Sequence, residues 1–251
     1  MPVRTYFCLV IFWIILSLLI LPALLKIAAP YGRHTRKGWG PSVSNTLGWI
    51  LMEIVSPAVF AFFFLSGNGN STVNMLFFAL WMIHYINRSL IFPFRLRDNG
   101  KRMPLLICLF AVAFNSMNGF LNGYWLGTLK TYDTTWLGDM RFIAGAALFI
   151  TGFAINLHSD NILLRLRKNK PDGSYQIPTG GFFRWVSCPN YFGEIIEWLG
   201  WALATWSLPG FSFALWTAAN LIPRALSNHR WYKNYFPDYP KGRKSIFPFL
   251  F

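Results

Sequence analysis

Residues 7–25 read FCLVIFWIILSLLILPALL, a run without a single charged side chain. A bilayer-spanning helix needs roughly 20 predominantly apolar residues, and this run approaches that length. The run is long for the apolar centre of a signal peptide. Pro22 and Lys26 also interrupt the small-residue pattern that a cleavage site requires. We therefore expect a membrane-spanning helix that is retained in the protein.

The rest of the chain repeats this apolar pattern. Of the 251 residues, 54% are hydrophobic and 13% are charged, and this charged share is about half that of an average soluble domain. Turn-forming clusters at 66–70, 99–100 and 171–173 separate the apolar stretches, and residues 208–210 are expected to form a tight hairpin. The predicted fold class is an all-α membrane protein with seven transmembrane helices. These helices are expected near residues 6–26, 43–66, 72–93, 104–125, 139–166, 190–207 and 209–232.

Basic residues are confined almost entirely to alternate connecting segments. They follow the first, third, fifth and last expected helices, whereas the segments after the second, fourth and sixth contain only Lys130. Because cytoplasmic loops carry the excess of lysine and arginine, this asymmetry predicts an N-terminus outside and a C-terminus in the cytoplasm. A face turned toward anionic lipids or an anionic cofactor then explains the net charge of +14, and we expect no nucleic-acid partner.

The three cysteines give no sign of a disulfide or a metal centre. Cys8, Cys108 and Cys188 lie far apart and are odd in number. Such spacing supports neither a disulfide framework nor a metal-ligand set, and buried thiols that act as small apolar groups are favoured. We therefore expect no metal ion.

Ionisable side chains at membrane depth are costly, which makes them candidates for function. Glu53 lies in the middle of the second expected helix, with no basic residue within a helical turn. It could form a structural hydrogen bond to another helix or line a polar active-site pocket. In the third expected helix, His84, Tyr85 and Arg88 interrupt an apolar stretch on neighbouring positions of one face. We favour a functional role for this cluster over the alternative that Arg88 merely snorkels to the membrane surface.

Three polar stripes lie toward the expected cytoplasmic ends of the last three helices. Steps of three and four residues place the members of each stripe on one face of its helix. One such stripe often only joins two helices, but three at the same depth indicate a shared cavity for a polar, anionic ligand. A phosphate-bearing cofactor fits, because arginine offers forked donors to phosphate. No glycine-rich dinucleotide fingerprint and no P-loop occurs. The stripes are Asn156, Asp160, Leu164 and Arg167; Asn190, Glu194, Glu197 and Trp198; and Arg224, Asn228 and Tyr232.

These motifs resemble those of the steroid 5α-reductases. The resemblance is dense over residues 145–251 and becomes sparser upstream, where Met52-Glu53 and His84–Arg88 (HYINR) still align with family motifs. The downstream motifs are Asn156–Lys168 (NLHSDNILLRLRK), Gly180–Phe183 (GGFF), Asn190–Trp198 (NYFGEIIEW), Ala202–Pro209 (ALATWSLP), Asp238–Lys244 (DYPKGRK) and Pro248–Phe251 (PFLF).

The resemblance implies a single seven-helix reductase domain that uses NADPH to saturate the carbon 4–5 double bond of a 3-oxo-Δ4-steroid. Residues 1–125 would mainly form the substrate pocket, and residues 139–251 would mainly bind the cofactor. Glu53 and Tyr85 would contact the 3-keto oxygen, and Trp198 would border the steroid and the nicotinamide. Asn156, Asp160, Arg167, Tyr175, Asn190, Glu194, Arg224 and Tyr232 would hold NADPH, with Arg88 and Arg97 nearby.

The sequence departs from the family pattern at three positions. Met52 replaces a glutamine before the catalytic acid, Asn228 replaces a histidine, and Gln176 replaces a basic residue after Tyr175. The first departure bears on substrate preference and the other two on cofactor affinity. The reaction itself would place negative charge on the 3-keto oxygen, where hydrogen-bond donors stabilise the transition state. Tyr85 can donate through its hydroxyl, and Glu53 can donate when its carboxyl is protonated.

Other functions remain open from the residues alone. A related reductase of a sterol, an enoyl thioester or a polyprenol would use the same cofactor residues. A membrane methyltransferase would bind S-adenosylmethionine, which has no phosphate to explain the arginines. A transporter would accommodate the intramembrane acids, but no inverted repeat supports it. We expect a monomer in the endoplasmic reticulum or, in a bacterium, the inner membrane.

Overall fold

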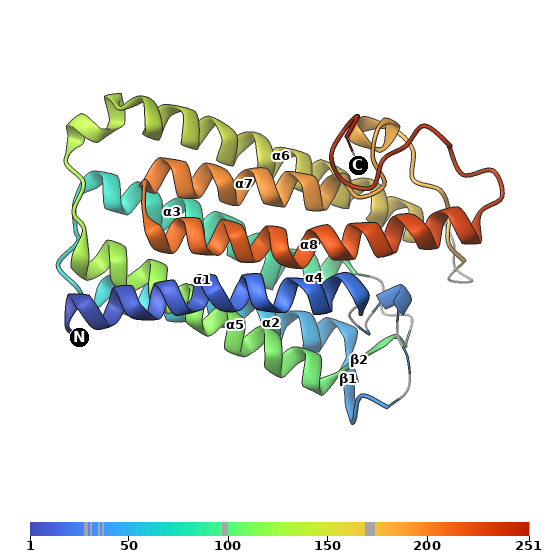
Figure 1. The fold of residues 1–251 in the computed structure, drawn as a ribbon, viewed down its shortest axis with the longest axis horizontal. Coiled ribbons are helices and arrows are strands. Elements are labelled where there is room, and N and C mark those ends of the chain that lie inside the picture. Colours follow the sequence, from blue (N-terminus) through green and yellow to red (C-terminus); the bar gives the residue numbers. More distant parts are fainter. Residues whose placement is uncertain are drawn as a thin grey trace. The chain divides into compact units, whose positions relative to one another are not determined.

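The computed structural model describes residues 1–27, 30, 32–34, 36, 38–96, 100–168 and 174–250. Long helices dominate this part of the chain, and two short strands pair antiparallel (Figure 1). The strands are β1 (Ser42–Ser44) and β2 (Arg102–Pro104). The helices are α1 (Val3–Lys26), α2 (Asn45–Leu65), α3 (Thr72–Ile86), α4 (Phe92–Arg95), α5 (Leu105–Tyr124), α6 (Met140–Lys168), α7 (Pro189–Thr205) and α8 (Leu208–Tyr235).

Short helical turns complete these elements. A π-helical turn at Asn87–Ile91 joins α3 to α4, and a second at Trp125–Leu129 extends α5. Turns of 3₁₀ helix occur at Gly32–His34, Thr134–Gly138 and Gly181–Arg184. With α3 and α4 counted as one segment, the described residues contain a long helix at each of the seven expected positions. The all-α prediction is therefore confirmed.

By length and composition, five of these segments are candidates to cross a membrane. Among the described residues they are Val3–Lys26, Asn45–Leu65, Thr72–Arg95, Leu105–Leu129 and Met140–Lys168. These helices expose many large apolar side chains, such as Leu19 and Phe62. Surfaces of this kind are suited to lipid rather than to water. The fold is thus consistent with an all-α membrane protein.

The expected hairpin at residues 208–210 is wrong. The helix α7 ends at Thr205, Trp206 adopts the left-handed conformation with φ of 40°, and α8 begins at Leu208. Pro209 and Gly210 therefore lie in the first turn of α8, where proline's fixed φ is compatible with a helix and its missing N–H has no cost. The expected turn at 66–70 is confirmed between α2 and α3, whereas Asn99 and residues 171–173 lie outside the described residues.

The chain divides into two compact units. Unit 1 comprises Met1–Phe12, Ala29–Ile143 and Ser207–Pro209. Unit 2 comprises Trp13–Ala28, Ala144–Trp206 and Gly210–Phe251. The two units are described separately below.

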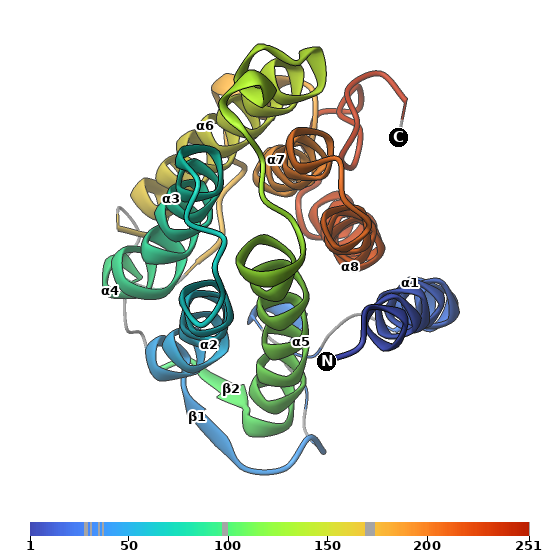
Figure 2. The same cartoon turned by 90° about the vertical axis from the view of Figure 1, so that its left-hand side faces the viewer.

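In unit 1, α2 and α5 run side by side in the same direction (Figure 2). A stripe of glycines on α5 allows their backbones to touch. A Cβ atom at Gly123 would lie 2.5 Å from the carbonyl oxygen of Phe60, and one at Gly127 would lie 2.6 Å from that of Phe63. Small residues at four-residue spacing are typical of such close helix pairs in membranes. The pairing of Val43 with Met103, between β1 and β2, joins the starts of the two helices.

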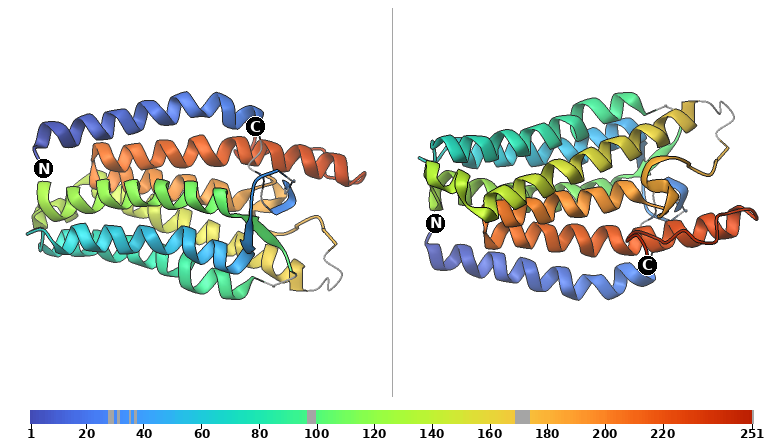
Figure 3. Two further views of the ribbon diagram at one scale, coloured as in Figure 1. Left: turned by 90° about the horizontal axis from the view of Figure 1, so that it is seen from below. Right: turned by 90° about the horizontal axis from the view of Figure 1, so that it is seen from above.

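In unit 2, α6 and α7 form a second close pair, antiparallel this time. A Cβ atom at Gly145 would lie 2.3 Å from the backbone nitrogen of Ala204, and one at Gly193 would lie 2.6 Å from that of Asn156. The second half of α1 lies along α8 (Figure 3). There the indole nitrogen of Trp216 donates to the Trp13 carbonyl at 2.8 Å. The close pair of α6 and α7 brings the polar stripes of these two helices against each other.

The close pair gives a first testable prediction. A Cβ atom at Gly152 would lie 2.3 Å from the Glu197 backbone nitrogen, and backbone cannot move aside as a flexible side chain can. We expect Gly152→Val to destabilise the protein by about 1–3 kcal/mol or more, seen as a lower unfolding midpoint in detergent. Gly138→Val is the control, because nothing lies within 4 Å of that position's Cβ. Equal midpoints for the two variants would contradict the close contact.

Candidate functional site

The first group of candidate residues lies on the seam between α2 and α3 of unit 1. Phe60 stacks on Trp81 with ring centroids 4.5 Å apart and planes 8° apart. Nearer the start of α2, Trp49 meets Phe92 edge-on at 5.4 Å. As residue numbers fall along α2 they rise along α3 and α4, so the two helical segments are antiparallel. These ring pairs define the register in which all other residues of the seam lie.

Glu53 lies on the face of α2 that points into this seam. It follows Trp49 by four residues and precedes Phe60 by seven, which places all three on one face of the helix. Both neighbours contact the α3–α4 segment. Glu53 is half-buried, and among the described residues none hydrogen-bonds to its carboxyl group. The alternative of a structural hydrogen bond to another helix therefore has no support in the described part of the chain.

Tyr85 occupies the corresponding place on α3. It is 3% exposed, and its ring lies 5.3 Å from that of Trp81. Arg88, three residues further on, is buried with its guanidinium 4.9 Å from the ring of Trp49. Along this segment Tyr85 therefore lies between Trp81, which contacts Phe60, and Arg88, which contacts Trp49. Glu53 lies between Trp49 and Phe60 on the facing helix, so the two candidate catalytic residues lie in the same stretch of the seam.

A π-helical turn follows Tyr85 directly. It spans Asn87–Ile91, and the hydroxyl of Ser89 donates to the Tyr85 carbonyl at 2.5 Å. Such turns are rare and are often found at functional sites. His84 is buried as well, with its ring 4.9 Å from that of Tyr85. No residue pattern in the sequence indicates the π turn, which changes the direction of the side chains that follow.

A row of buried asparagines on α5 was not among the residues predicted from the sequence. Asn115, Asn118 and Asn122 are all at most 6% exposed. Asn115 donates through Nδ2 to the Met52 carbonyl at 2.6 Å, so the row begins at the level of Glu53. Steps of three and four residues within an apolar helix are the same signal that revealed the other stripes. The row could therefore have been found from the sequence.

Met52, which stands where the family has glutamine, points away from the α2–α3 seam. Its side chain is 6% exposed and packs with Met103 and Cys108 in an apolar cluster beside α5. A polar amide at this position would be buried among sulfur atoms and methyl groups. Methionine is therefore well suited to this environment.

In unit 2, polar residues of α6 and α7 form one hydrogen-bonded network. Asn156 donates through Nδ2 to the Asn190 carbonyl at 3.0 Å and to Glu194 Oε2 at 3.3 Å. Asn190 in turn donates to Asp160 Oδ1 at 3.1 Å. The first two predicted stripes therefore meet. Among the described residues nothing hydrogen-bonds to Asn156 Oδ1, although this atom is buried, and an acceptor of this kind is costly unless a ligand donates to it.

The third stripe, on α8, is joined to the residues around the start of α7. Arg224 donates through Nε to the Tyr191 hydroxyl at 2.8 Å. Asn228 donates through Nδ2 to the sulfur of Cys188 at 3.7 Å. The ring of Tyr232 stacks on that of Tyr239, which follows α8, at 5.3 Å and 11°. Tyr191 and Cys188 lie on either side of Asn190 in the sequence, so all three stripes gather near the start of α7.

Trp198 and Glu197 lie deeper in unit 2. Trp198 is 1% exposed and packs against Phe213 at 4.3 Å and Phe149 at 5.9 Å, measured between ring centroids. Glu197 is fully buried beside the close approach of α7 to Gly152. The structure therefore gives Trp198 an aromatic environment within unit 2.

The remaining candidates lie outside the hydrogen-bonded network. Arg167 is exposed, about two helical turns beyond Asp160 on α6. Tyr175 is half-buried, with its ring 4.7 Å from that of Trp231 near the end of α8. Arg97 lies outside the described residues.

Comparison with known proteins agrees with these features. Residues 101–251 match the model of a family described as 3-oxo-5-alpha-steroid 4-dehydrogenase. The chain is 43% identical to "Steroid 5-alpha-reductase DET2" of Gossypium hirsutum, over 98% of this chain and 97% of that protein. It is also 43% identical to "3-oxo-5-alpha-steroid 4-dehydrogenase 1" of Homo sapiens, over 88% of this chain and 86% of the human protein. The chain therefore belongs to the 3-oxo-5-alpha-steroid 4-dehydrogenase family.

Proposed function

We propose that this protein is a membrane-embedded reductase that saturates the carbon 4–5 double bond of a 3-oxo-Δ4-steroid with NADPH. The observation that carries the proposal is the placement of Glu53 and Tyr85 on facing sides of one helix seam in unit 1. A carboxyl group to which no described residue hydrogen-bonds and a buried phenol in the same stretch of the seam can both bind one ligand oxygen. Membership of the steroid 4-dehydrogenase family supports a 3-oxo-steroid as the source of that oxygen.

The two side chains would act on the charge that develops during the reaction. Addition of hydride to the β-carbon of the enone moves negative charge to the 3-keto oxygen as an enolate. Tyr85 donates a hydrogen bond to this oxygen, and Glu53 can donate a second one when its carboxyl carries a proton. Donors that are already in position stabilise the transition state more than the ground state, because the charge is larger there. The buried guanidinium of Arg88 adds a positive field beside them.

The polar network of unit 2 is suited to hold the cofactor. The buried, unpartnered Oδ1 atom of Asn156 can accept from an amide or a hydroxyl group, and nicotinamide ribosides carry both. Asp160 and Glu194 offer further acceptors for ribose hydroxyls, and Arg224 offers donors for phosphate. When bound, NADPH supplies the hydride. These residues fix its position, and Trp198 limits the access of water.

The proposal is tested by incubating the purified, reconstituted protein with NADPH and a panel of lipids. The panel contains a 3-oxo-Δ4-steroid, an unsaturated sterol, an enoyl thioester and a polyprenol. The products are analysed by mass spectrometry. We expect the steroid to gain two hydrogens and to be the preferred substrate by kcat/KM. Preference for another member would assign the same chemistry to a different lipid. Absence of any reduction would refute a reductase.

The proposed topology has seven membrane crossings, with the N-terminus outside and the C-terminus in the cytoplasm. It adds α7 and α8 to the five segments whose apolar length already qualifies them. The alternation of basic connecting segments supports it. Reporter fusions after Asn68 and after Phe251 are expected to report opposite sides of the membrane, and signals from the same side would refute seven crossings. We propose a monomer in the endoplasmic reticulum or the bacterial inner membrane.

A further inference from the structure

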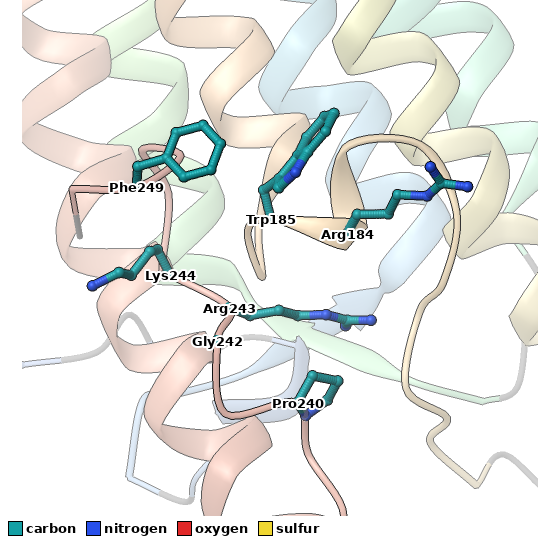
Figure 4. Close-up of a pocket in the computed structure, with 7 residues that line it drawn as sticks. All are labelled: Arg184, Trp185, Pro240, Gly242, Arg243, Lys244 and Phe249. Carbon is teal, nitrogen blue, oxygen red and sulfur yellow. The ribbon is translucent and has the colours of Figure 1, made fainter.

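A pocket outside the proposed reaction site lies in unit 2, between the tail that follows α8 and the segment that precedes α7 (Figure 4). Its volume is about 320 Å³. The lining combines three basic side chains (Arg184, Arg243 and Lys244) with two aromatic ones (Trp185 and Phe249), and no acidic residue is among the described residues that line it. This composition is that of a site for an anion with an apolar part.

The walls of the pocket are braced by backbone hydrogen bonds. The Lys244 N–H donates to the Trp185 carbonyl at 2.8 Å, and the Ser187 N–H donates to the Lys244 carbonyl at 2.8 Å. The Cys188 N–H continues the ladder to the Ser245 carbonyl at 3.1 Å. The two segments that carry the lining side chains therefore hold each other in a defined register, so a ligand meets a preformed site.

Arg243 is the residue that points to a ligand. It is 7% exposed, and among the described residues nothing hydrogen-bonds to its Nε and Nη1 atoms. Its guanidinium carbon lies 5.4 Å from the ring of Tyr239, which burial keeps protonated by raising the pKa of its hydroxyl. Tyr239 therefore provides no negative charge. A buried guanidinium with two nitrogen atoms that lack an acceptor is costly, and a phosphate can accept from Nε and a terminal nitrogen together.

A second arginine is placed to share the same anion. In Figure 4 the side chains of Arg184 and Arg243 extend in the same direction from opposite walls, whereas Lys244 extends in the opposite direction. Arg184 is exposed, so it can adjust to a bound group without disturbing the fold. Two guanidinium groups on one side of the pocket favour a phosphate over a single carboxylate, because phosphate presents more oxygens.

The aromatic side of the pocket indicates what carries the phosphate. Trp185 is 41% exposed and Phe249 is 78% exposed, although both rings are large and apolar. Exposed aromatic rings beside basic residues are typical of segments that lie at a membrane surface. A free phosphate would leave the Phe249 ring in water, whereas the glycerol and acyl part of a lipid would cover it.

We propose that the Arg184–Arg243 pocket binds the phosphate headgroup of an anionic phospholipid, with its apolar part against Trp185 and Phe249. This binding would anchor the tail at the membrane surface. It is independent of the proposed reaction, because none of these residues is assigned to the catalytic or cofactor-binding groups.

The test is a calorimetric titration of the purified full-length protein, in an uncharged detergent, with dihexanoyl phosphatidic acid. We expect Arg184→Gln to weaken binding about tenfold, the effect of one charge-assisted hydrogen bond. Arg230→Gln is the matched control, since it removes the same charge from an exposed position outside the pocket. Phe249→Ala is expected to weaken binding of the lipid but not of inorganic phosphate.

Several results would overturn the proposal. These are no binding to the wild type, equal weakening by Arg184→Gln and Arg230→Gln, or an unchanged lipid affinity in Phe249→Ala. Displacement of the lipid by NADP⁺ would assign the pocket to the cofactor instead. Arg243→Gln is expected to abolish binding, and if this buried substitution prevents folding, the exposed Arg184→Gln variant still decides. None of these measurements depends on turnover, so they are independent of whether the protein reduces a steroid.

Discussion

Replacing Glu53 with alanine is expected to lower turnover about a hundred- to a thousandfold while leaving NADPH binding nearly unchanged. This is the typical effect of losing one donor to a developing oxyanion. Glu53 lies in the α2–α3 seam of unit 1, and no described residue hydrogen-bonds to its carboxyl. Its removal therefore breaks no hydrogen bond in the described part of the chain. The loss should appear in kcat rather than in folding or cofactor affinity.

Two further substitutions separate the chemistry of this position from its shape. Glu53→Gln keeps both a donor and the side-chain volume, so it should retain more activity than Glu53→Ala. Tyr85→Phe deletes the other proposed donor and should lose about as much turnover as Glu53→Ala. Because both groups act on one oxygen, the double variant should lose less than the product of the two single losses.

The quantity to measure is turnover per correctly folded, NADPH-bound molecule. Ser56→Ala is the matched control on the same face of α2, three residues from Glu53. Its hydroxyl is fully buried, and among the described residues nothing hydrogen-bonds to it, so its removal should leave turnover near that of the wild type. Near-normal turnover in Glu53→Ala, with lower stability, would show that the carboxyl is structural.

The second large effect concerns the choice of cofactor. We expect the protein to bind NADP⁺ more tightly than NAD⁺ by about ten- to a hundredfold, because the 2′-phosphate gains a charge-assisted pair worth roughly 1.5–3 kcal/mol. Arg88, Arg95, Arg97 and Arg167 are the candidate partners of this phosphate, and Arg167 is better placed than Arg88. It is exposed at the end of α6, whereas the guanidinium of Arg88 lies over two aromatic rings.

Arg167→Gln should reduce this preference, with little effect on the affinity for NAD⁺. Arg165→Gln is the control, because Arg165 is equally exposed on α6 but points to another side of the helix, two residues away. Equilibrium binding of both cofactors to all three proteins is the measurement. Equal affinities of the wild type for the two cofactors would contradict the prediction, and an unchanged ratio in Arg167→Gln would assign the phosphate to another residue.

Helix positions followed from the sequence because apolar length and turn-forming residues are local properties. Each expected helix has a counterpart in the structure, with ends that differ by a few residues. The error at residues 208–210 has the same origin. Proline and glycine occur both in turns between helices and in the first turn of a helix, so these residues alone do not distinguish the two. A tryptophan in the sequence also gives no sign of the left-handed conformation that Trp206 adopts at the end of α7.

For the candidate residues too, one part could be predicted from the sequence and another part depended on tertiary contacts. Helical spacing alone grouped Asn156 with Asp160 and Asn190 with Glu194, since side chains three or four residues apart must share a face. The two groups meet because glycines on α6 and α7 let the two backbones touch. The residues that come together in this way lie many positions apart in the sequence. Roles in catalysis and cofactor binding stay predictions for all of these residues.

The sequence by itself therefore determined the fold class, the helices and the polar face of each helix, because hydropathy and periodicity act within a single element. Tertiary structure alone decided the register of α2 against α3, which places Trp49 of α2 against Arg88, and the π turn at Asn87–Ile91. It also decided that the tail encloses a basic pocket against the segment before α7. Contacts between distant segments depend on the packing of whole helices, and no local pattern of residues encodes them.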